Sequence, residues 1–311
     1  MSMQDQVLSS VHQGAAMPVL YVSHGSPMFA LEPGQTGPAL GRWGQALVQA
    51  YGRPRAVVLL SPHWMTQGLE VMTAARPATW HDFGGFPEAL YALQYPAPGA
   101  PQLAHELLQR LLAAGLPAHA NPERPMDHGA WVPLRHLFPE ADVPVLQISL
   151  PAGFDTPQVY ALGQAVAGLR EQGVLIVGSG SMTHNLAEFR QLRPAGQLLL
   201  KSGQAMNANP NPGADDQAVG GDSDCLPYVR EFSRWIEQHL RQADVSALLD
   251  YRARAPHAHR AHPTQEHFLP LFFALGAAAD QAGVRYLSRE VMYQTLAMDA
   301  MVFGEQAQVA G

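Results

Sequence analysis

The chain has 311 residues, of which 47% are hydrophobic and 14% charged, and its formal net charge is −7. Charge this sparse and acidic argues against nucleic-acid binding, which needs basic surfaces to replace phosphate counterions. Cys225 is the only cysteine, which excludes an intrachain disulfide and a thiolate zinc cluster. No apolar run approaches the ~20 residues of a membrane span, and residues 1–16 lack a signal-peptide pattern, so we expect a cytoplasmic protein.

The chain is expected to form one folded domain over residues 17–304, between a flexible N-terminus (1–16) and a tail (305–311). The segment 206–224 (MNANPNPGADDQAVGGDSD) has almost nothing to bury and is interpreted as a mobile loop or excursion. It can also be read as a domain boundary. A helical pattern over residues 266–279 is apolar enough to need a sheet beneath it, which favours a single domain.

Short apolar runs alternate with longer helical patterns along the chain. Buried strands are predicted over residues 18–23, 55–61, 69–74, 144–149 and 174–179, and helices over 39–51, 102–114 and 156–171. Continuous apolar strands joined by helices are typical of an α/β fold whose sheet is covered on both faces. We therefore predict the α/β class, with a central, largely parallel or mixed sheet between two layers of helices.

Three of the fourteen histidines follow predicted strands. His24 comes directly after the first strand, His63 after the second, and His184 five residues after the strand that ends at Ser179. Because ligands of open α/β sheets bind at the carboxyl ends of the strands, these three side chains are expected to converge there. A single histidine at a strand end is usually a polar cap, but three at equivalent ends also suit a metal site.

Other histidines are candidates with weaker patterns. His267 lies in a predicted helix start, with Thr264 as N-cap and Glu266 in the first turn, where the helix dipole favours the neutral imidazole that a metal needs. His128 sits beside Asp127 at a turn before a helical run. His81 either lines a pocket or caps a turn with Asp82. The tract containing His257, His259 and His262 is interpreted as a solvated basic loop.

The Gly-rich stretch GSGS (178–181) follows a strand but lacks the spacing of a dinucleotide or phosphate loop. We expect its glycines to let the backbone approach a site closely. None of Ser26, Ser179 and Ser181 stands in the G-x-S-x-G frame of a nucleophile elbow, so a serine hydrolase is a weak contender.

A series of segments resembles one enzyme family: MPVLYVSHGSPM, AVVLLSPHW, HDFGGFPEALYALQYPAPG, DHGAWVPL, VLIVGSGSMTHNL, EHFLPLFFALGAA and AMDAMVFG. They occur in the same order as the corresponding segments of that family, from about residue 17 to residue 304. Together they are similar to the DODA-type extradiol aromatic ring-opening dioxygenases, the DOPA 4,5-dioxygenase family of the protocatechuate 4,5-dioxygenase (class III extradiol) superfamily. Residues 206–224 and the HAHR stretch depart from that pattern.

The resemblance implies a catalytic domain over 17–304 with one non-heme metal ion, Fe(II) for ring cleavage and Zn(II) in some relatives. It implies His24, His63 and His267 as ligands. Glu266 is the alternative third ligand, because the wider superfamily uses a carboxylate there. His184 matches the acid/base histidine and is a possible fourth ligand, and His128 matches a histidine near the substrate.

The implied substrates are a catechol and O2. Three protein ligands leave open positions on the metal, and a histidine such as His184 can take a phenolic proton and return one later. A flat ring suits aromatic walls, for which the candidates are His81, Phe83, Phe86, Tyr91 and Trp131, although each is equally well an ordinary packing residue. The same histidines also suit a zinc hydrolase or a non-catalytic zinc-binding protein. Which catechol is cleaved, at which bond, and the oligomeric state do not follow from the sequence.

Overall fold

The computed structural model describes residues 15–192, 225–278 and 283–305. Residues 1–14 of the expected flexible N-terminus and residues 306–311 of the expected tail lie outside the described residues. So does the whole of segment 206–224, for which we predicted a loop or excursion.

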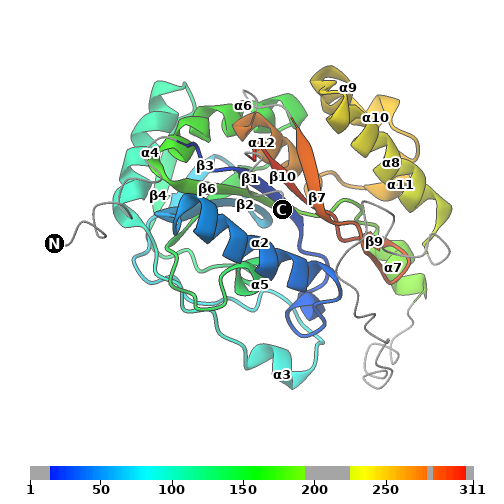
Figure 1. Ribbon diagram of the computed structural model, residues 1–311, viewed down its shortest axis with the longest axis horizontal. Helices are drawn as coiled ribbons and strands as arrows, with labels where there is room; N and C mark the ends of the chain where they lie inside the picture. The colour runs from blue at the N-terminus through cyan, green and yellow to red at the C-terminus, as the bar shows by residue number, and fades with distance from the viewer. Residues whose placement is uncertain (1–14, 193–224, 279–282, 306–311) are drawn as a thin grey trace.

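The core of the molecule is an eight-stranded sheet with the order β4-β3-β5-β2-β6-β1-β10-β7 (Figure 1). The four central strands, β5, β2, β6 and β1, are parallel, whereas β3 runs antiparallel to β5, and β10 runs antiparallel to both β1 and β7. The bounds are β1 Val19–Ser23, β2 Ala56–Thr66, β3 Leu69–Met72, β4 Ala118–Asn121, β5 Val145–Pro151, β6 Val174–Gly180, β7 Val284–Ser288 and β10 Ala300–Phe303. The mixed sheet with a parallel centre confirms the predicted fold class.

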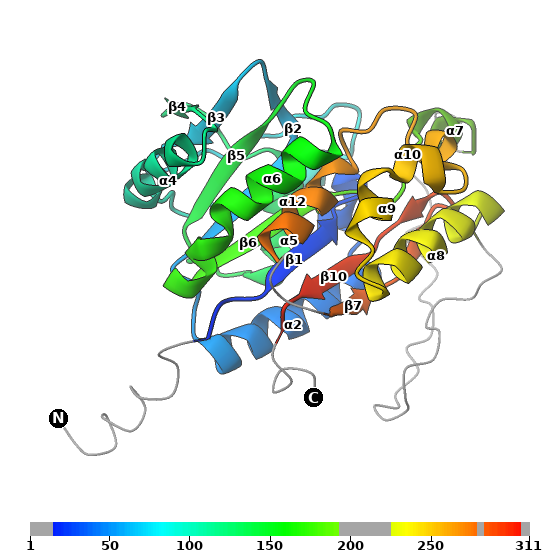
Figure 2. The same ribbon diagram turned by 90° about the horizontal axis from the view of Figure 1, so that it is seen from above.

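Helices cover both faces of this sheet. One layer contains η1 (Pro27–Ala30), α2 (Thr36–Tyr51) and α5 (His128–Leu137), and the opposite layer contains α4 (Pro101–Ala113), α6 (Thr156–Val166), α8 (Pro227–Arg241) and α12 (Leu269–Ala277). In Figure 2 the layer of α6 and α12 lies in front of the sheet and α2 lies behind it. Each face therefore has its own hydrophobic core, as continuous apolar strands require.

Shorter elements complete the chain. They are α3 Glu88–Tyr91, η2 Ala167–Gln172, α7 Leu186–Leu192, α9 Val245–Leu249, α10 Tyr251–Arg254, α11 Ala258–Ala261, and the small hairpin of β8 Val291–Met292 and β9 Leu296–Ala297. Within the described ranges, no helix is long and apolar enough to cross a membrane.

Helix α12 is buried because two glycines let it touch its neighbour α6. A Cβ atom on Gly163 would lie 2.2 Å from the carbonyl oxygen of Phe273, and one on Gly276 would lie 2.0 Å from that of Tyr160. Backbones can approach this closely only without side chains in between. The apolar pattern that predicted this helix therefore reflects packing on both sides, against α6 and against the sheet.

Three local predictions were wrong. Strand β2 runs on to Thr66, so His63 lies within the strand, near a register shift against β5, instead of after it. Helix α12 begins at Leu269 without a side-chain cap, and the hydroxyl of Thr264 donates to Glu266 instead. His262, expected in a solvated loop, is fully buried. Its ring contacts Phe268 and forms a hydrogen bond with the backbone oxygen of Met182.

Candidate metal centre

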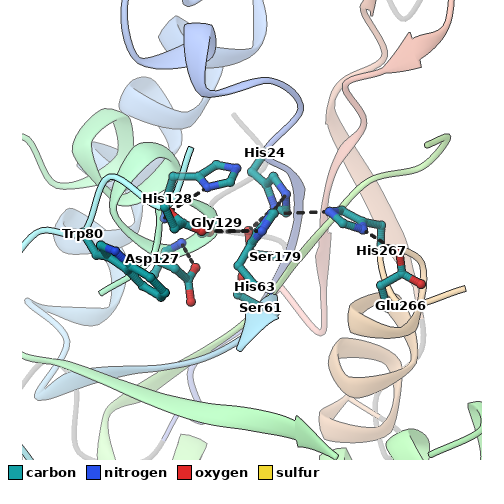
Figure 3. Close-up of polar contacts among 12 residues, drawn as sticks. His24, Ser61, His63, Trp80, Asp127, His128, Gly129, Ser179, Glu266 and His267 are labelled. Carbon is teal, nitrogen blue, oxygen red and sulfur yellow. Dashed lines mark hydrogen bonds and ion pairs between the residues drawn. The ribbon is translucent and has the colours of Figure 1, made fainter. Parts of the chain in front are cut away.

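Neighbouring parallel strands end at one edge of the sheet and deliver polar side chains there. His24 follows β1 directly, His63 lies near the end of β2, and Ser179 lies in β6, which pairs with both strands. His267 comes from the segment before α12 and is held at this edge because its carbonyl oxygen accepts from the amide of Ser181 at 2.7 Å. Figure 3 shows the resulting cluster, with His63 lying between His24 and His267.

The three imidazoles of His24, His63 and His267 direct nitrogen atoms at one another. The Nε2 atoms of His63 and His24 are 3.0 Å apart, and those of His267 and His63 are 3.4 Å apart. Nitrogen ligands about 2.0–2.1 Å from a shared ion lie roughly 2.8–3.4 Å apart at the angles of octahedral and tetrahedral coordination. The donor set therefore fits a single divalent ion.

Hydrogen bonds on the far side of two of these rings leave the Nε2 atoms unprotonated. The hydroxyl of Ser179 donates to the carbonyl oxygen of Gly129 at 2.5 Å, so the 3.0 Å contact between Ser179 and His24 requires Nδ1 of His24 to be the donor. Nδ1 of His267 lies 3.4 Å from Oε1 of Glu266. Metal-binding histidines usually donate their second ring N–H to such a partner, which fixes the tautomer.

Burial keeps the cluster neutral. Desolvation is the largest effect and repulsion from neighbouring imidazoles the second. Together they lower the pKa of His24 and of His267 well below the usual range, and the pKa of His63 to about 4. Burial raises the pKa of Glu266, but hydrogen bonds from His267, the backbone and Thr264 outweigh this effect and bring it to about 2. The site thus offers neutral imidazoles beside one ionised carboxylate, which suits a cation.

His184 and His128 each lie against a different ring of the three-histidine cluster. The ring of His184 stacks on His267, with centroids 3.6 Å apart and planes 7° apart, and burial lowers the pKa of His184 to about 4 against the opposing effect of Glu266. The ring of His128, in the first turn of α5, has its centroid 3.9 Å from that of His63. The five histidines singled out from the sequence therefore meet at one place.

The carboxylate of Glu266 also lies at the cluster, but on the Nδ1 side of His267 and not beside the three facing Nε2 atoms. Glu266 lies near His184 and His267, and the ligand atoms of these three residues are within 4.8 Å of one another. The same holds for His24, His63 and His267, so His267 is shared by two sets and Glu266 belongs to only one.

The expected aromatic walls form a connected group beside His128. Phe83 is the member that reaches the histidines, with its ring centroid 5.5 Å from that of His128, and it packs against Phe86 and Tyr91 at 5.3 and 5.4 Å. His81 contacts Phe83 at 5.7 Å, and its Nε2 bonds to the backbone oxygen of Leu93. Trp131 is completely buried behind this group, where its indole N–H donates to the backbone oxygen of Trp80.

Glycines in and near the GSGS stretch allow the close approach that the sequence predicts. A Cβ atom on Gly180 would lie 2.3 Å from the carbonyl oxygen of His267, and one on Gly178 would lie 2.1 Å from that of Pro270. On the other side, a Cβ atom on Gly129 would lie 2.3 Å from Oγ of Ser61 and 3.0 Å from Cδ2 of His63. The histidines can meet only because these positions have no side chain.

Replacing Gly180 by alanine is expected to push the His267 segment away from β6. We expect a stability loss of about 1–3 kcal/mol, typical of overpacking, together with weaker binding of zinc, measured by thermal melting and by competition with a chelator. The control is Gly68→Ala, where the added methyl group has open space. Unchanged zinc affinity in Gly180→Ala would show that this close contact does not position His267.

Sequence reasoning missed two residues that hold the histidines in place. Ser179 was considered only as a nucleophile, and Asp82 only as a partner of His81. Asp82 instead accepts hydrogen bonds from Nδ1 and from the backbone amide of His128, both at 2.9 Å. Burial raises the pKa of Asp82, but these bonds outweigh it and lower the pKa overall. The available signal was a hydrogen-bond acceptor near each histidine of the cluster, but the fold decides which acceptor serves which ring.

Comparison with known proteins identifies the family. The model of the catalytic LigB subunit of aromatic ring-opening dioxygenase matches residues 18–304. A protein of Beta vulgaris named 4,5-DOPA dioxygenase extradiol is 34% identical over 264 residues, covering 84% of this chain and 87% of that protein. A protein of the same name from Escherichia coli is 33% identical over 281 residues, covering 88% of each.

A solved structure agrees with these matches. The crystal structure of the uncharacterized protein JW3007 from Escherichia coli K12 superposes with a TM-score of 0.67 at 26% identity, covering 93% of this chain and all of the other. The family model spans nearly the whole described fold, including every histidine of the cluster. The chain therefore belongs to the family of the catalytic LigB subunit of aromatic ring-opening dioxygenases, and it is an extradiol dioxygenase, a metal-dependent oxidoreductase.

Proposed function

We propose that His24, His63 and His267 bind one divalent metal ion through their Nε2 atoms, with Glu266 outside the ligand set. The observation that carries this assignment is that Nε2 of His63 lies 3.0 Å from Nε2 of His24 and 3.4 Å from Nε2 of His267. The rings of His24 and His267 are buried, and each has a partner at Nδ1. Glu266 approaches the Nδ1 side of His267, which is the position of an outer partner that orients a ligand.

Fe(II) is the proposed metal for catalysis. When bound by these residues, the ion would supply the redox chemistry that cleavage of the ring by dioxygen requires. Imidazole ligands also accept zinc, which binds more tightly than Fe(II) to most sites of this kind. We therefore propose that zinc can occupy the same site without supporting ring cleavage.

The remaining histidines act on protons and on substrate orientation. A catechol must lose phenolic protons to bind a metal through its oxygens, and a neutral imidazole can accept one. His184 is proposed for this role, because it is neutral and stacks directly on a metal-binding ring. His128 is proposed to bond a substrate oxygen, and Phe83 to contact the flat ring, with Phe86, Tyr91 and His81 supporting Phe83 and Trp131 packed behind them.

The substrate is proposed to be a catechol that carries a side chain, of which DOPA is the first example to test. The support is the name shared by the relatives from Beta vulgaris and Escherichia coli, each matched over more than four-fifths of its length. The position of ring opening is proposed to be 4,5 on the same ground.

The test is oxygen uptake by the iron-loaded protein. Purified protein is loaded with Fe(II) under argon and mixed with DOPA, protocatechuate or catechol, and air is then admitted. We expect uptake of one O2 per molecule of substrate consumed, with a yellow ring-opened product, and no uptake by the zinc-loaded protein. Full iron occupancy without uptake on any of the three catechols would contradict the proposed substrate class.

A further inference from the structure

Asp82 lies between two histidines that have different proposed roles. Its Oδ1 accepts from Nδ1 and from the backbone amide of His128, both at 2.9 Å, and its Oδ2 lies 3.6 Å from Nδ1 of His63. The side chain is 8% exposed, so water competes little for either oxygen. The His63 contact needs a shift of only about 0.5 Å to become a hydrogen bond.

The other two proposed ligands each have an acceptor of their own at Nδ1. Ser179 serves His24 and Glu266 serves His267. The backbone of His63 makes two hydrogen bonds. Arg124 donates to the carbonyl oxygen of His63 at 3.1 Å, and the amide of His63 donates to Oγ of Ser61 at 3.2 Å. These contacts fix where the His63 ring is attached but not which of its nitrogens carries the proton.

We propose that Asp82 is a positioning residue: it holds the proton of His128 on Nδ1 and, when the metal is bound, accepts from Nδ1 of His63, so that one carboxylate directs both Nε2 atoms into the site. This inference rests on the proposed metal ligands and deepens that assignment. It links the metal to the substrate-contacting histidine through a single side chain. If a substrate bound at His128 displaced the carboxylate of Asp82, the contact between Asp82 and the His63 ring would change as well.

Asp82→Asn tests this arrangement with little change in shape. An amide has one accepting oxygen and one donating NH2 group. Since two donors of His128 converge on Oδ1, the amide oxygen is expected there and the NH2 group beside His63. An NH2 donor favours an unprotonated Nδ1, which moves the proton of His63 to Nε2 and blocks the metal.

We expect Asp82→Asn to bind zinc 10- to 100-fold more weakly than the wild type in chelator competition, the range for loss of an outer partner of a ligand. The control is Asp155→Asn, which makes the same chemical change at the N-cap of α6, where an asparagine oxygen can still accept. Zinc affinity within twofold of wild type in Asp82→Asn would overturn the proposal.

A second measurement is made on the wild type and so does not depend on the folding of Asp82→Asn. Long-range ¹H–¹⁵N spectra of the zinc-loaded wild type, and of the same protein after chelation, report the protonated nitrogen of each histidine, with His63→Gln and His128→Gln used to assign the signals. We expect His128 to be protonated at Nδ1 in both samples, because Asp82 accepts from that atom at 2.9 Å. A His128 protonated at Nε2 in either sample would overturn the proposal. Zinc binding retained in His63→Ala would instead refute the ligand assignment, and the Asp82 proposal with it.

Discussion

Replacing His24 or His63 by alanine is expected to remove the metal and the activity together. Each substitution takes away one of three proposed ligands, so the loss should exceed the roughly 100-fold upper range for outer partners of a ligand. Metal content after dialysis and oxygen uptake with a catechol measure the two effects. The matched control is His105→Ala, which removes an exposed histidine from α4 and should leave both unchanged.

The same measurement decides between His267 and Glu266 as third ligand. We expect His267→Ala to lose the metal and Glu266→Ala to keep it stoichiometrically with lower affinity, because Glu266 contacts Nδ1 of His267 and not the facing Nε2 atoms. Full iron occupancy in His24→Ala or His63→Ala would refute the ligand set. Loss of the metal in Glu266→Ala together with its retention in His267→Ala would assign the carboxylate as the ligand.

His184→Gln is expected to keep the metal and lose turnover. Glutamine preserves a polar side chain but cannot shuttle a proton near neutral pH, and removal of general acid–base catalysis typically costs about 10²–10⁴-fold in rate. The measurement is kcat for oxygen uptake at full iron occupancy, compared with iron content of the same sample. The control is His119→Gln, the same change at an exposed position of β4.

Loss of iron in His184→Gln would identify His184 as a fourth ligand. Its ring stacks on His267 and groups with Glu266, so a role in metal binding predicts a distinct result: the iron content falls in parallel with kcat. Unchanged kcat at full occupancy would remove His184 from the mechanism and leave His128 as the remaining histidine for proton transfer.

The fold followed well from local patterns because the central strands are buried on both faces. Strands such as β1, β5 and β6 are rich in apolar residues and buried along their whole length, and each lies within two residues of its predicted bounds. The errors fall where local patterns compete with tertiary contacts. Thr264 has the residue type of an N-cap, but its hydroxyl donates to Glu266, whose charge lies beside the histidine cluster. His262 looked solvated because its sequence neighbours are charged, yet its ring packs against Phe268 and Phe232.

The amino-acid sequence by itself placed His24 and His184 after predicted strands and His63 close to another, at the edge where an α/β sheet binds its ligands. It also carried the family resemblance that the comparisons confirm. Only the tertiary structure decided which nitrogen of a ring faces its neighbours, because that depends on the acceptors at Nδ1. Ser179 and Asp82 are 155 and 46 residues away from the histidines they bond, and no local pattern relates positions so far apart.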